Sequence, residues 1–299
     1  MRRFFTVLLT SIIAAAASAP VSALPSPEQG VVLSQSTDPF SALVGKRVER
    51  RSTRRASHDV QRYVLASDDR AFLFEERTNG ALIKFLCGAD DPRLDCSIDP
   101  ESTAAEIYQL LPTRGPRGDV IYKNAEGDTL LRIASYGGAT VFWPGEGRGY
   151  GASKSFGDDA SLGLPLMSRE TAERRARAAT ALISALTGAP IIFEVAPVAG
   201  PPSMAKAQTT AHSTTHSTAL APVLADAVVR TAAGLQMVAN DPTGARIIAN
   251  RIQRVLFQEA AVSNVDLAEG VLTIQYVPEM DIEGRPSSRA VARYLEETL

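Results

Sequence analysis

Residues 71–85 read AFLFEERTNGALIKF, two apolar runs on either side of a turn sequence. The two runs, Ala71–Glu76 and Leu82–Cys87, carry the aromatic and β-branched residues that are enriched in strands. The pair Asn79-Gly80 between them is a strong short-range hairpin signal, because both residues tolerate the positive φ that a tight turn needs. This stretch therefore predicts an antiparallel hairpin at the centre of a β-rich domain.

Similar segments extend the hairpin on both sides. Val60–Leu65 supplies a third strand, and three more are predicted after it, at Asp119–Lys123, Asp128–Ala134 and Ala139–Trp143. Residues 70–85 align with residues 128–143 without a gap, which favours two related three-stranded meanders packed as a small barrel or sandwich. The alternative is that both sets only share the need for a glycine turn before a strand.

Helices and one short strand are expected around the meanders. Ser102–Leu111 has apolar residues at helical spacing and predicts a short helix between the two sets. The alternating glycines from Gly145 to Gly151 match no phosphate-binding pattern and predict a flexible loop. Ser168 can cap a helix that runs to Thr187 and ends at a glycine, and Ile191–Val195 predicts a strand.

The C-terminal part predicts two helices, a hairpin and a third helix. Val223–Val238 is one apolar helix, and Asp241 caps a second that continues to Phe257. A hairpin and a last helix follow, at Val262–Leu267, Val271–Val277 and from Ser287 or Ser288 onward. The predicted fold class is α+β, with an N-terminal antiparallel β-meander domain with helices and then a C-terminal ααββα unit.

The predicted domain organisation has five parts. Residues 1–23 are a signal peptide and residues 24–39 a flexible lead-in. Residues 40–196 form the β-rich domain with flanking helices, and residues 222–299 form the C-terminal α+β domain. Between them, residues 197–221 are rich in Pro, Ser, Thr and Ala, a composition typical of an exposed linker.

The first residues predict export. Arg2 and Arg3 precede an apolar core, Phe4–Ala17, and Val21-Ser22-Ala23 matches the small-residue pattern that signal peptidases accept. The apolar core is shorter than the roughly 20 residues that span a bilayer, which disfavours a transmembrane anchor. We therefore expect cleavage after Ala23, and no transmembrane anchor in the mature chain.

Cys87 and Cys96 are the two cysteines of the chain. In an oxidising compartment, a pair at this spacing predicts one disulfide that closes a small loop. The alternative is a metal-binding or redox pair, but the spacing matches neither a zinc motif nor a thioredoxin motif.

Charge restricts the partners. The formal net charge is −2, which argues against a dedicated nucleic-acid binder. Residues 40–57 predict a helix with five arginines on one face, at Arg47, Arg50, Arg51, Arg54 and Arg55. This face is either a solvated surface or a binding face for lipid headgroups or an acidic partner.

No catalytic motif is apparent. The three histidines, His58, His212 and His216, lie in polar segments without an H-E-x-x-H or G-x-S-x-G pattern, so neither a cofactor nor a metal is expected. The acid pair of a hydrolase could be drawn from Asp119 and Asp128, which begin predicted strands, and from Asp158 and Asp159, which lie in a predicted turn.

The residues before the last helix leave two interpretations open. Gly284, Arg285 and Ser287 could form an anion-binding turn at the N-terminus of that helix. The alternative is a capped helix with a paired arginine.

Several motifs resemble a known family. Tyr63–Gly151 resembles a family of exported bacterial proteins classified only as a domain of unknown function, through residues 117–121 (RGDVI), 131–132 (LR) and 137–142 (GGATVF). Residues 284–288 (GRPSS) are similar to its C-terminal pattern, and the insertion between Cys87 and Cys96 departs from it. The resemblance implies the periplasm of a Gram-negative bacterium, or secretion, and brings no activity or catalytic residues.

Two functions remain as hypotheses. The first is a non-enzymatic envelope protein that binds another envelope protein, a polymer or lipid headgroups. The second is a hydrolase that acts on a cell-envelope polymer, for which two carboxyl groups must face each other across a cleft.

Overall fold

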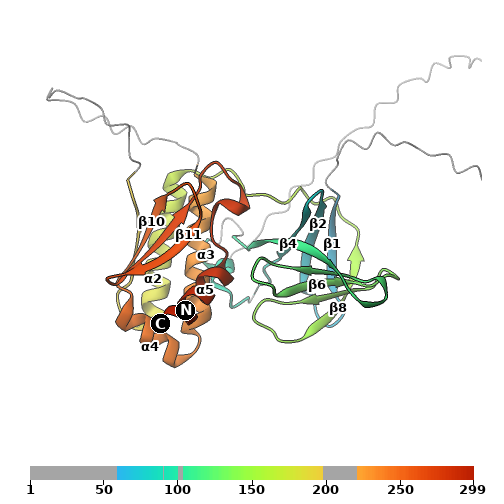
Figure 1. The fold of residues 1–299 in the computed structure, drawn as a ribbon, viewed down its shortest axis with the longest axis horizontal. Helices are drawn as coiled ribbons and strands as arrows, with labels where there is room; N and C mark the ends of the chain where they lie inside the picture. Colours follow the sequence, from blue (N-terminus) through green and yellow to red (C-terminus); the bar gives the residue numbers. More distant parts are fainter. Residues whose placement is uncertain (1–58, 90, 100–103, 198–220) are drawn as a thin grey trace, which may run out of the picture. The chain divides into compact units, whose positions relative to one another are not determined.

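The computed structural model describes residues 59–89, 91–99, 104–197 and 221–299. All of them fall within one unit of the chain, Ala56–Leu299, and form a β-barrel and a helix-covered sheet, here called the helical layer (Figure 1).

The barrel is an eight-stranded antiparallel meander. Each strand pairs with its neighbour in sequence, and β1 pairs with β8 to close the sheet. The strands are β1 (Val60–Leu65), β2 (Ala71–Arg77), β3 (Gly80–Phe85), β4 (Ile107–Arg114), β5 (Val120–Lys123), β6 (Thr129–Ile133), β7 (Ala139–Phe142) and β8 (Gly149–Ser155). All six strands predicted from the sequence are thus confirmed, and the sheet is a barrel rather than a sandwich.

The β2–β3 turn shows why this hairpin forms. Arg77 pairs with Gly80, so Thr78 and Asn79 alone make the connection. Gly80 has φ of +150°, and a Cβ atom at this position would lie 2.5 Å from the Leu110 carbonyl oxygen of β4. Glycine is therefore required at position 80, where the turn ends and β3 begins.

Two predictions in the barrel region are wrong. The predicted helix at 102–111 is instead β4 from Ile107 onward, in which buried Tyr108 and Leu110 alternate with exposed Gln109 and Leu111. The predicted loop at 145–151 becomes strand β8 from Gly149, because its backbone pairs with both β7 and β1. In both places sheet pairing outweighs the local pattern.

The helical layer has a mixed four-stranded sheet in the order β11-β12-β10-β9. Its strands are β9 (Ile192–Val195), β10 (Arg254–Glu259), β11 (Asn264–Ala268) and β12 (Val271–Tyr276). β10 runs parallel to both of its neighbours, and β11 and β12 form the predicted hairpin. Its turn has Glu269 and Gly270 at positive φ, as a tight hairpin turn requires.

Five helices complete the described part of the chain. They are α1 (Leu94–Ser97), α2 (Arg169–Thr187), α3 (Pro222–Ala239), α4 (Pro242–Arg251) and α5 (Ser288–Thr298), with short 3₁₀ turns at Pro116–Gly118 and Ile282–Gly284. The predicted caps are confirmed: Ser168 accepts from the Thr171 N–H, Asp241 caps α4 and Ser287 caps α5. α3 is the central helix and contacts α2, α4 and α5.

The predicted ααββα unit needs a correction. The helix expected from Asp241 to Phe257 ends at Arg251, and residues 254–259 form β10, so the order after residue 221 is ααβββα. Val255 and Phe257 point into the core while Arg254 and Gln258 are exposed, which is the period of a strand. This segment becomes a strand because β9 and β12 flank it.

Elements from both sides of residues 198–220 share this layer. β9 pairs with β10, and α2 packs against α3 in the same apolar core. The predicted domain division assigns α2 and β9 to the same part of the chain as the barrel. In the structure, both elements pack with segments that follow residue 220. None of the helices in the described residues combines the length and the apolar character of a membrane crossing.

Candidate functional site

Buried charges join the barrel to the helical layer. Arg230 of α3 is fully buried; its Nε donates to Asp226 at 3.2 Å and its Nη1 to Asp95 at 3.2 Å. Its Nη2 donates to the carbonyl oxygen of Ala104, just before β4. Its Nη1 also lies 3.6 Å from Glu106, so one guanidinium serves three carboxylates.

A second arginine continues this network. Arg285 Nε donates to Asp226 at 2.6 Å, and its Nη1 lies 3.6 Å from Glu106. Glu106 in turn accepts hydrogen bonds from the backbone N–H, at 3.1 Å, and the hydroxyl of Ser288. Glu106 therefore holds the first residue of α5, where a carboxylate also complements the helix dipole.

Burial and charge act in opposite directions on Asp226. Burial alone would raise the pKa of its carboxyl group, but Arg230 and Arg285 outweigh this effect and lower the pKa below its ordinary value. The group is thus ionised and paired. We refer to Asp95, Glu106, Asp226, Arg230 and Arg285 as the junction network.

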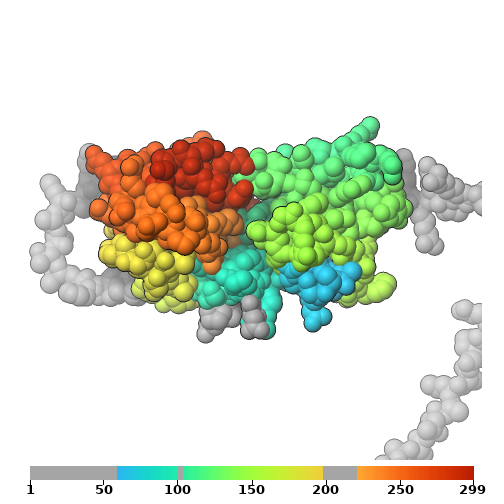
Figure 2. Space-filling model, turned by 90° about the horizontal axis from the view of Figure 1, so that it is seen from below, coloured from blue at the N-terminus to red at the C-terminus, as the bar shows by residue number. Residues whose placement is uncertain are grey.

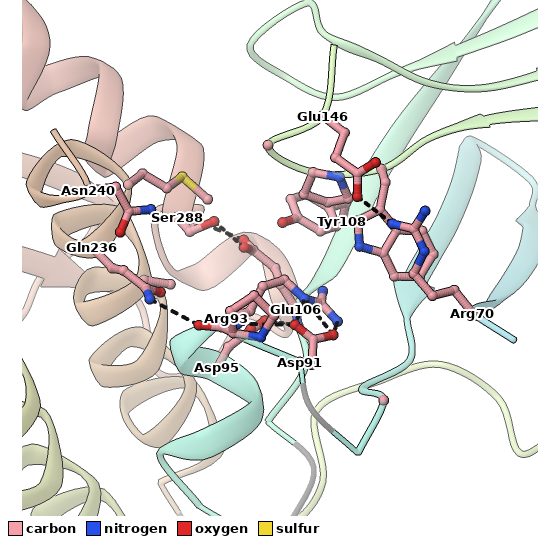
Figure 3. A pocket seen from close by; sticks show the side chains of 17 residues that line it. Arg70, Asp91, Arg93, Asp95, Glu106, Tyr108, Glu146, Gln236, Asn240 and Ser288 are labelled. Atoms are coloured by element: carbon pink, nitrogen blue, oxygen red, sulfur yellow. Dashed lines mark hydrogen bonds and ion pairs between the residues drawn. The ribbon is translucent and has the colours of Figure 1, made fainter. Parts of the chain in front are cut away.

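A hollow of about 500 Å³ lies beside the junction network. Trp143 and Tyr108 come from the barrel, Ala233, Gln236 and Met237 come from α3, and Asn240 directly follows α3 as its C-cap. Figure 3 shows Gln236 and Asn240 on one side of the hollow and Tyr108 on the other. Asp95, Glu106 and Ser288 also line it, so the buried network forms part of its wall. We call this hollow the main pocket.

Two arginines stack on the tryptophan of the main pocket. The guanidinium carbon of Arg70 lies 4.7 Å from the centre of the Trp143 ring, and that of Arg93 lies 5.6 Å from it. Both distances fall within the range of cation–π attraction. Trp143 also meets Phe85 edge-on at 4.8 Å and is the single tryptophan of the chain.

Each of these arginines belongs to the same local motif, Asp-x-Arg. Asp68 accepts from the backbone N–H of Arg70 and from its Nε, both at 3.0 Å. Asp91 accepts from the corresponding groups of Arg93 at 3.1 and 3.0 Å.

The bonds within these motifs keep both aspartates ionised. Hydrogen bonds from Arg70 lower the pKa of Asp68 to about 2. Burial would raise the pKa of Asp91, but the bonds from Arg93 bring it below its ordinary value. Both arginines are therefore neutralised within their own loops, and Arg70 pairs with Glu146 as well (Figure 3).

Tyr108 lies buried where the pocket meets the junction network. Burial raises the pKa of its phenol well above the ordinary value, and the charges of Glu106 and Asp95 add to this effect. The hydroxyl thus stays protonated at neutral pH and can act as a donor.

A second hollow of about 580 Å³ adjoins the main pocket. Both are lined by Tyr108, by Met237 of α3 and its C-cap residue Asn240, and by residues 143–146 of the β7–β8 loop. The second hollow adds Asn124, Asp128 and Thr129 from the barrel and Arg289 and Glu296 from α5. Figure 2 shows the surface recessed between the orange helices α3 and α4 and the green barrel strands.

The predicted disulfide is confirmed and forms part of the same region. Cys87 and Cys96 are bonded, with Cα atoms 5.6 Å apart. The loop that they close contains Gly88, Asp91, Arg93 and Asp95, all of which line the main pocket. The disulfide therefore ties down one wall of the pocket.

Three of the four aspartates proposed for hydrolysis, Asp119, Asp128 and Asp159, have different structural roles. Asp119 bonds Arg132 and the backbone N–H of Ser135, and Asp159 bonds Arg62. Asp128 bonds Asn124 and Arg289, across the second hollow. Within the described residues, no interaction joins any two of the four aspartates.

The remaining candidate residues lie in two places. Arg285 is engaged by Asp226 and Glu106, while Ser287 accepts from the Ala290 N–H and donates to Glu126. The carbonyl oxygen of Gly284 accepts a hydrogen bond from the Val277 N–H. An anion-binding turn at Gly284, Arg285 and Ser287 stays a prediction. The arginine face (Arg47, Arg50, Arg51, Arg54 and Arg55) and the three histidines lie outside the described residues.

Sequence reasoning missed the main pocket. Its residues come from positions as distant as Arg70, Trp143 and Asn240, and no spacing rule connects them. One signal was present: the Asp-x-Arg motif occurs twice, at Asp68 and at Asp91, each time in a turn after an apolar strand. In the described residues, no group of three or more His, Cys, Asp or Glu side chains could hold a metal ion.

The fold defines a class of two-layered α+β proteins in which a closed antiparallel barrel is fixed to a helical layer by buried charges. The family model described as "Domain of unknown function (DUF4908)" matches residues 39–295, and the chain belongs to this family. No curated protein and no solved structure matches the chain.

Proposed function

We propose that this protein is a non-enzymatic binding module of the cell envelope and that the main pocket holds its ligand. The observation that carries this proposal is the pocket itself. It combines an aromatic and apolar lining with a few convergent polar groups, which is the usual composition of a ligand site.

The chemistry of the pocket supports binding rather than catalysis. Its carboxylates Asp95 and Glu106 are both paired with Arg230, and Asp91 is paired with Arg93. Hydrolysis by an acid pair needs one protonated and one free carboxyl group across a cleft, and paired carboxylates are poorly suited to that work.

Two features support a location outside the cytoplasm. The N-terminal residues follow the signal-peptide pattern, and disulfides such as Cys87–Cys96 persist mainly in oxidising compartments. Cell fractionation with mass spectrometry of the mature N-terminus tests this part of the proposal. We expect a periplasmic or secreted chain that begins at Leu24, and an uncleaved cytoplasmic chain would contradict it.

Trp143 provides the test of binding. Because it is the single tryptophan and lines the pocket, its fluorescence reports the pocket alone. Envelope extract, separated into protein, polysaccharide and lipid fractions, is titrated into the mature protein. We expect one fraction to shift the emission in a saturable way, without chemical change in that fraction.

The opposite result is also defined. If no fraction shifts the emission while an envelope polymer is cleaved by the protein, the hydrolase hypothesis replaces this proposal. Substitution Asn240→Ala, at an exposed position of the pocket, should weaken a genuine shift, whereas Asn264→Ala on β11 should leave it unchanged.

A further inference from the structure

We propose that the ligand is a neutral oligosaccharide that lies along both hollows at once. This inference rests on the proposed binding function and names the class of ligand. The main pocket and the second hollow together are called the joint groove.

The shape of the joint groove favours an extended ligand. Its two parts measure about 500 and 580 Å³, each within the size range of a small-ligand site. They share as common lining the β7–β8 loop at residues 143–146, Met237 of α3 and Asn240 at the end of that helix. A chain of several linked units can contact both parts, whereas one compact molecule fills only one.

The charged side chains that line the groove, apart from the exposed Glu296 of α5, are paired within the protein. Arg70 is neutralised by Asp68 and Glu146, and Arg93 by Asp91. Asp95 and Glu106 are paired with Arg230, Glu106 also with Arg285, and Asp128 with Arg289. An anionic ligand would have to break one of these pairs to find a counter-ion, because every arginine of the groove is paired, and this costs the pairing energy of a partly buried charge. A neutral ligand leaves every pair intact.

The polar groups that remain suit hydroxyl groups. Side-chain amides both donate and accept hydrogen bonds, as sugar hydroxyls do. Asn240 contributes such an amide to both parts of the groove, is exposed, and makes no side-chain hydrogen bond to other described residues. Phe142, which is partly exposed in the second hollow, adds aromatic surface against which the C–H face of a sugar ring can pack. Trp143 and Tyr108 are buried beneath the groove, and Trp143 is covered by Arg70 and Arg93.

An extended peptide finds less support in the same groove. Peptides bound in extended form usually add a strand to a free sheet edge. The barrel has no free edge, because β1 pairs with β8. On β9, the outward N–H of Phe193 donates to Thr180, and on β11 the N–H of Leu267 donates to Tyr294. These edges are covered by side chains of the helices.

The experiment is a Trp143 fluorescence titration of the mature protein with four probes of similar length. Two are neutral oligosaccharides, tetra-N-acetylchitotetraose and maltotetraose; the third is a sulfated tetrasaccharide; the fourth is an end-blocked tetra-alanine peptide. We expect saturable binding of at least one neutral oligosaccharide and no saturation with the sulfated sugar or the peptide.

Matched variants locate the binding. Loss of one hydrogen bond in Asn240→Ala should raise the Kd about five- to tenfold. The same change at Asn264, on the exposed edge strand β11, should leave the Kd within about twofold. Binding that Asn240→Ala does not weaken would overturn the placement in the joint groove.

The failures of the two proposals are distinguishable. If the sulfated sugar or the peptide saturates and the neutral sugars do not, the ligand class is wrong but the binding function stands. If none of the four probes binds while an envelope fraction still shifts the Trp143 emission, the ligand class is again wrong and the binding function stands. If neither the probes nor any fraction shifts the emission, the binding function itself fails.

Discussion

The barrel fills its interior with aromatic rings, whereas the helical layer is packed with aliphatic side chains. Tyr63 stacks on Phe72 at 5.0 Å, and Phe74 meets Tyr122 edge-on at 5.0 Å. In the helical layer, α3 is buried along most of its length through valine, leucine and alanine. The barrel pairs only sequence neighbours and its two end strands, while the sheet of the layer joins segments from both sides of residues 198–220.

The contrast shows that each region has an apolar core of its own. At the junction, charges are buried instead: Arg230 and Glu106 are nearly inaccessible to solvent and pair across it. Apolar packing is non-directional, but hydrogen-bonded charges impose a defined geometry. The junction network thus fixes the two cores relative to each other and leaves room beside it for the main pocket.

The largest effect is expected from Arg230→Met. This change removes the guanidinium shared by Asp95, Glu106 and Asp226 and leaves buried carboxylates with fewer partners. Breaking a buried pair in this way costs about 3–5 kcal/mol. Urea unfolding followed by circular dichroism measures the loss.

The control is Arg254→Met, which removes an ion pair to Glu194 in which both side chains are about half exposed. An exposed pair contributes roughly 0–1 kcal/mol, so the free energy of unfolding should change little. If both variants lose the same stability, the junction network is no more important than a surface pair, and buried charge does not distinguish the junction from the rest of the molecule.

The disulfide should have the next largest effect on stability. Cys87 and Cys96 are nine positions apart, and the loop-entropy relation gives a contribution of about 2–3 kcal/mol. The double variant Cys87→Ser/Cys96→Ser should lose this amount in urea unfolding. Because the closed loop carries Arg93, which stacks on Trp143, the tryptophan emission of the folded variant should also change.

Reduction of the native protein by dithiothreitol provides an independent check. It should reproduce both effects of the double variant without any substitution. An unchanged Trp143 emission in both samples would show that the loop keeps its position without the disulfide.

The acid side of the stability curve should report Asp226. Its pKa in the folded protein lies below its ordinary value, so its ionisation stabilises the fold above the unfolded pKa of about 3.9, and this stabilisation is lost as the pH falls through the folded pKa. The difference in the free energy of unfolding between the native protein and Asp226→Asn should therefore be constant above about pH 5 and become smaller at lower pH. The control is Thr180→Val, which removes no titratable group. Its free energy of unfolding should differ from that of the native protein by the same amount at every pH.

The sequence predicted the barrel strands well because each hairpin depends on neighbouring residues and on a local turn, such as Asn79-Gly80. It failed at Ile107–Leu111, where apolar residues at mixed spacing fit both a helix and a strand. The disulfide was predictable because both cysteines lie in one short segment.

The helical layer and the pocket depend on contacts that no local pattern contains. Residues 254–257 continue an apolar helical pattern, and only the partners β9 and β12 make them a strand. The pocket brings Arg70, Trp143 and Asn240 together, and this proximity follows from closing the barrel and docking it on α3. The repeated Asp-x-Arg motif could have been noted, but its stacking on Trp143 could not have been derived.

The smallest effect concerns the edge of the helical layer, which is protected differently from the closed barrel. Thr180 of α2 accepts the outward N–H of Phe193 at 3.0 Å, so a helix side chain takes the place that a neighbouring strand has in the barrel. Thr180→Val keeps the shape of the side chain but leaves this N–H without its acceptor. The expected loss is about 1–2 kcal/mol, with faster hydrogen exchange at the Phe193 amide.

Thr187→Val is the matched control, because the Thr187 hydroxyl bonds only carbonyl oxygens, those of Ile183 and Ala189. It removes a hydroxyl from the same helix without uncovering a strand N–H, so its loss should stay below about 0.5 kcal/mol and exchange at Phe193 should not change. Equal losses in the two variants would mean that the edge of β9 is not held by Thr180. A selective loss would show that the open sheet depends on its helix for the edge protection that the barrel achieves by closure.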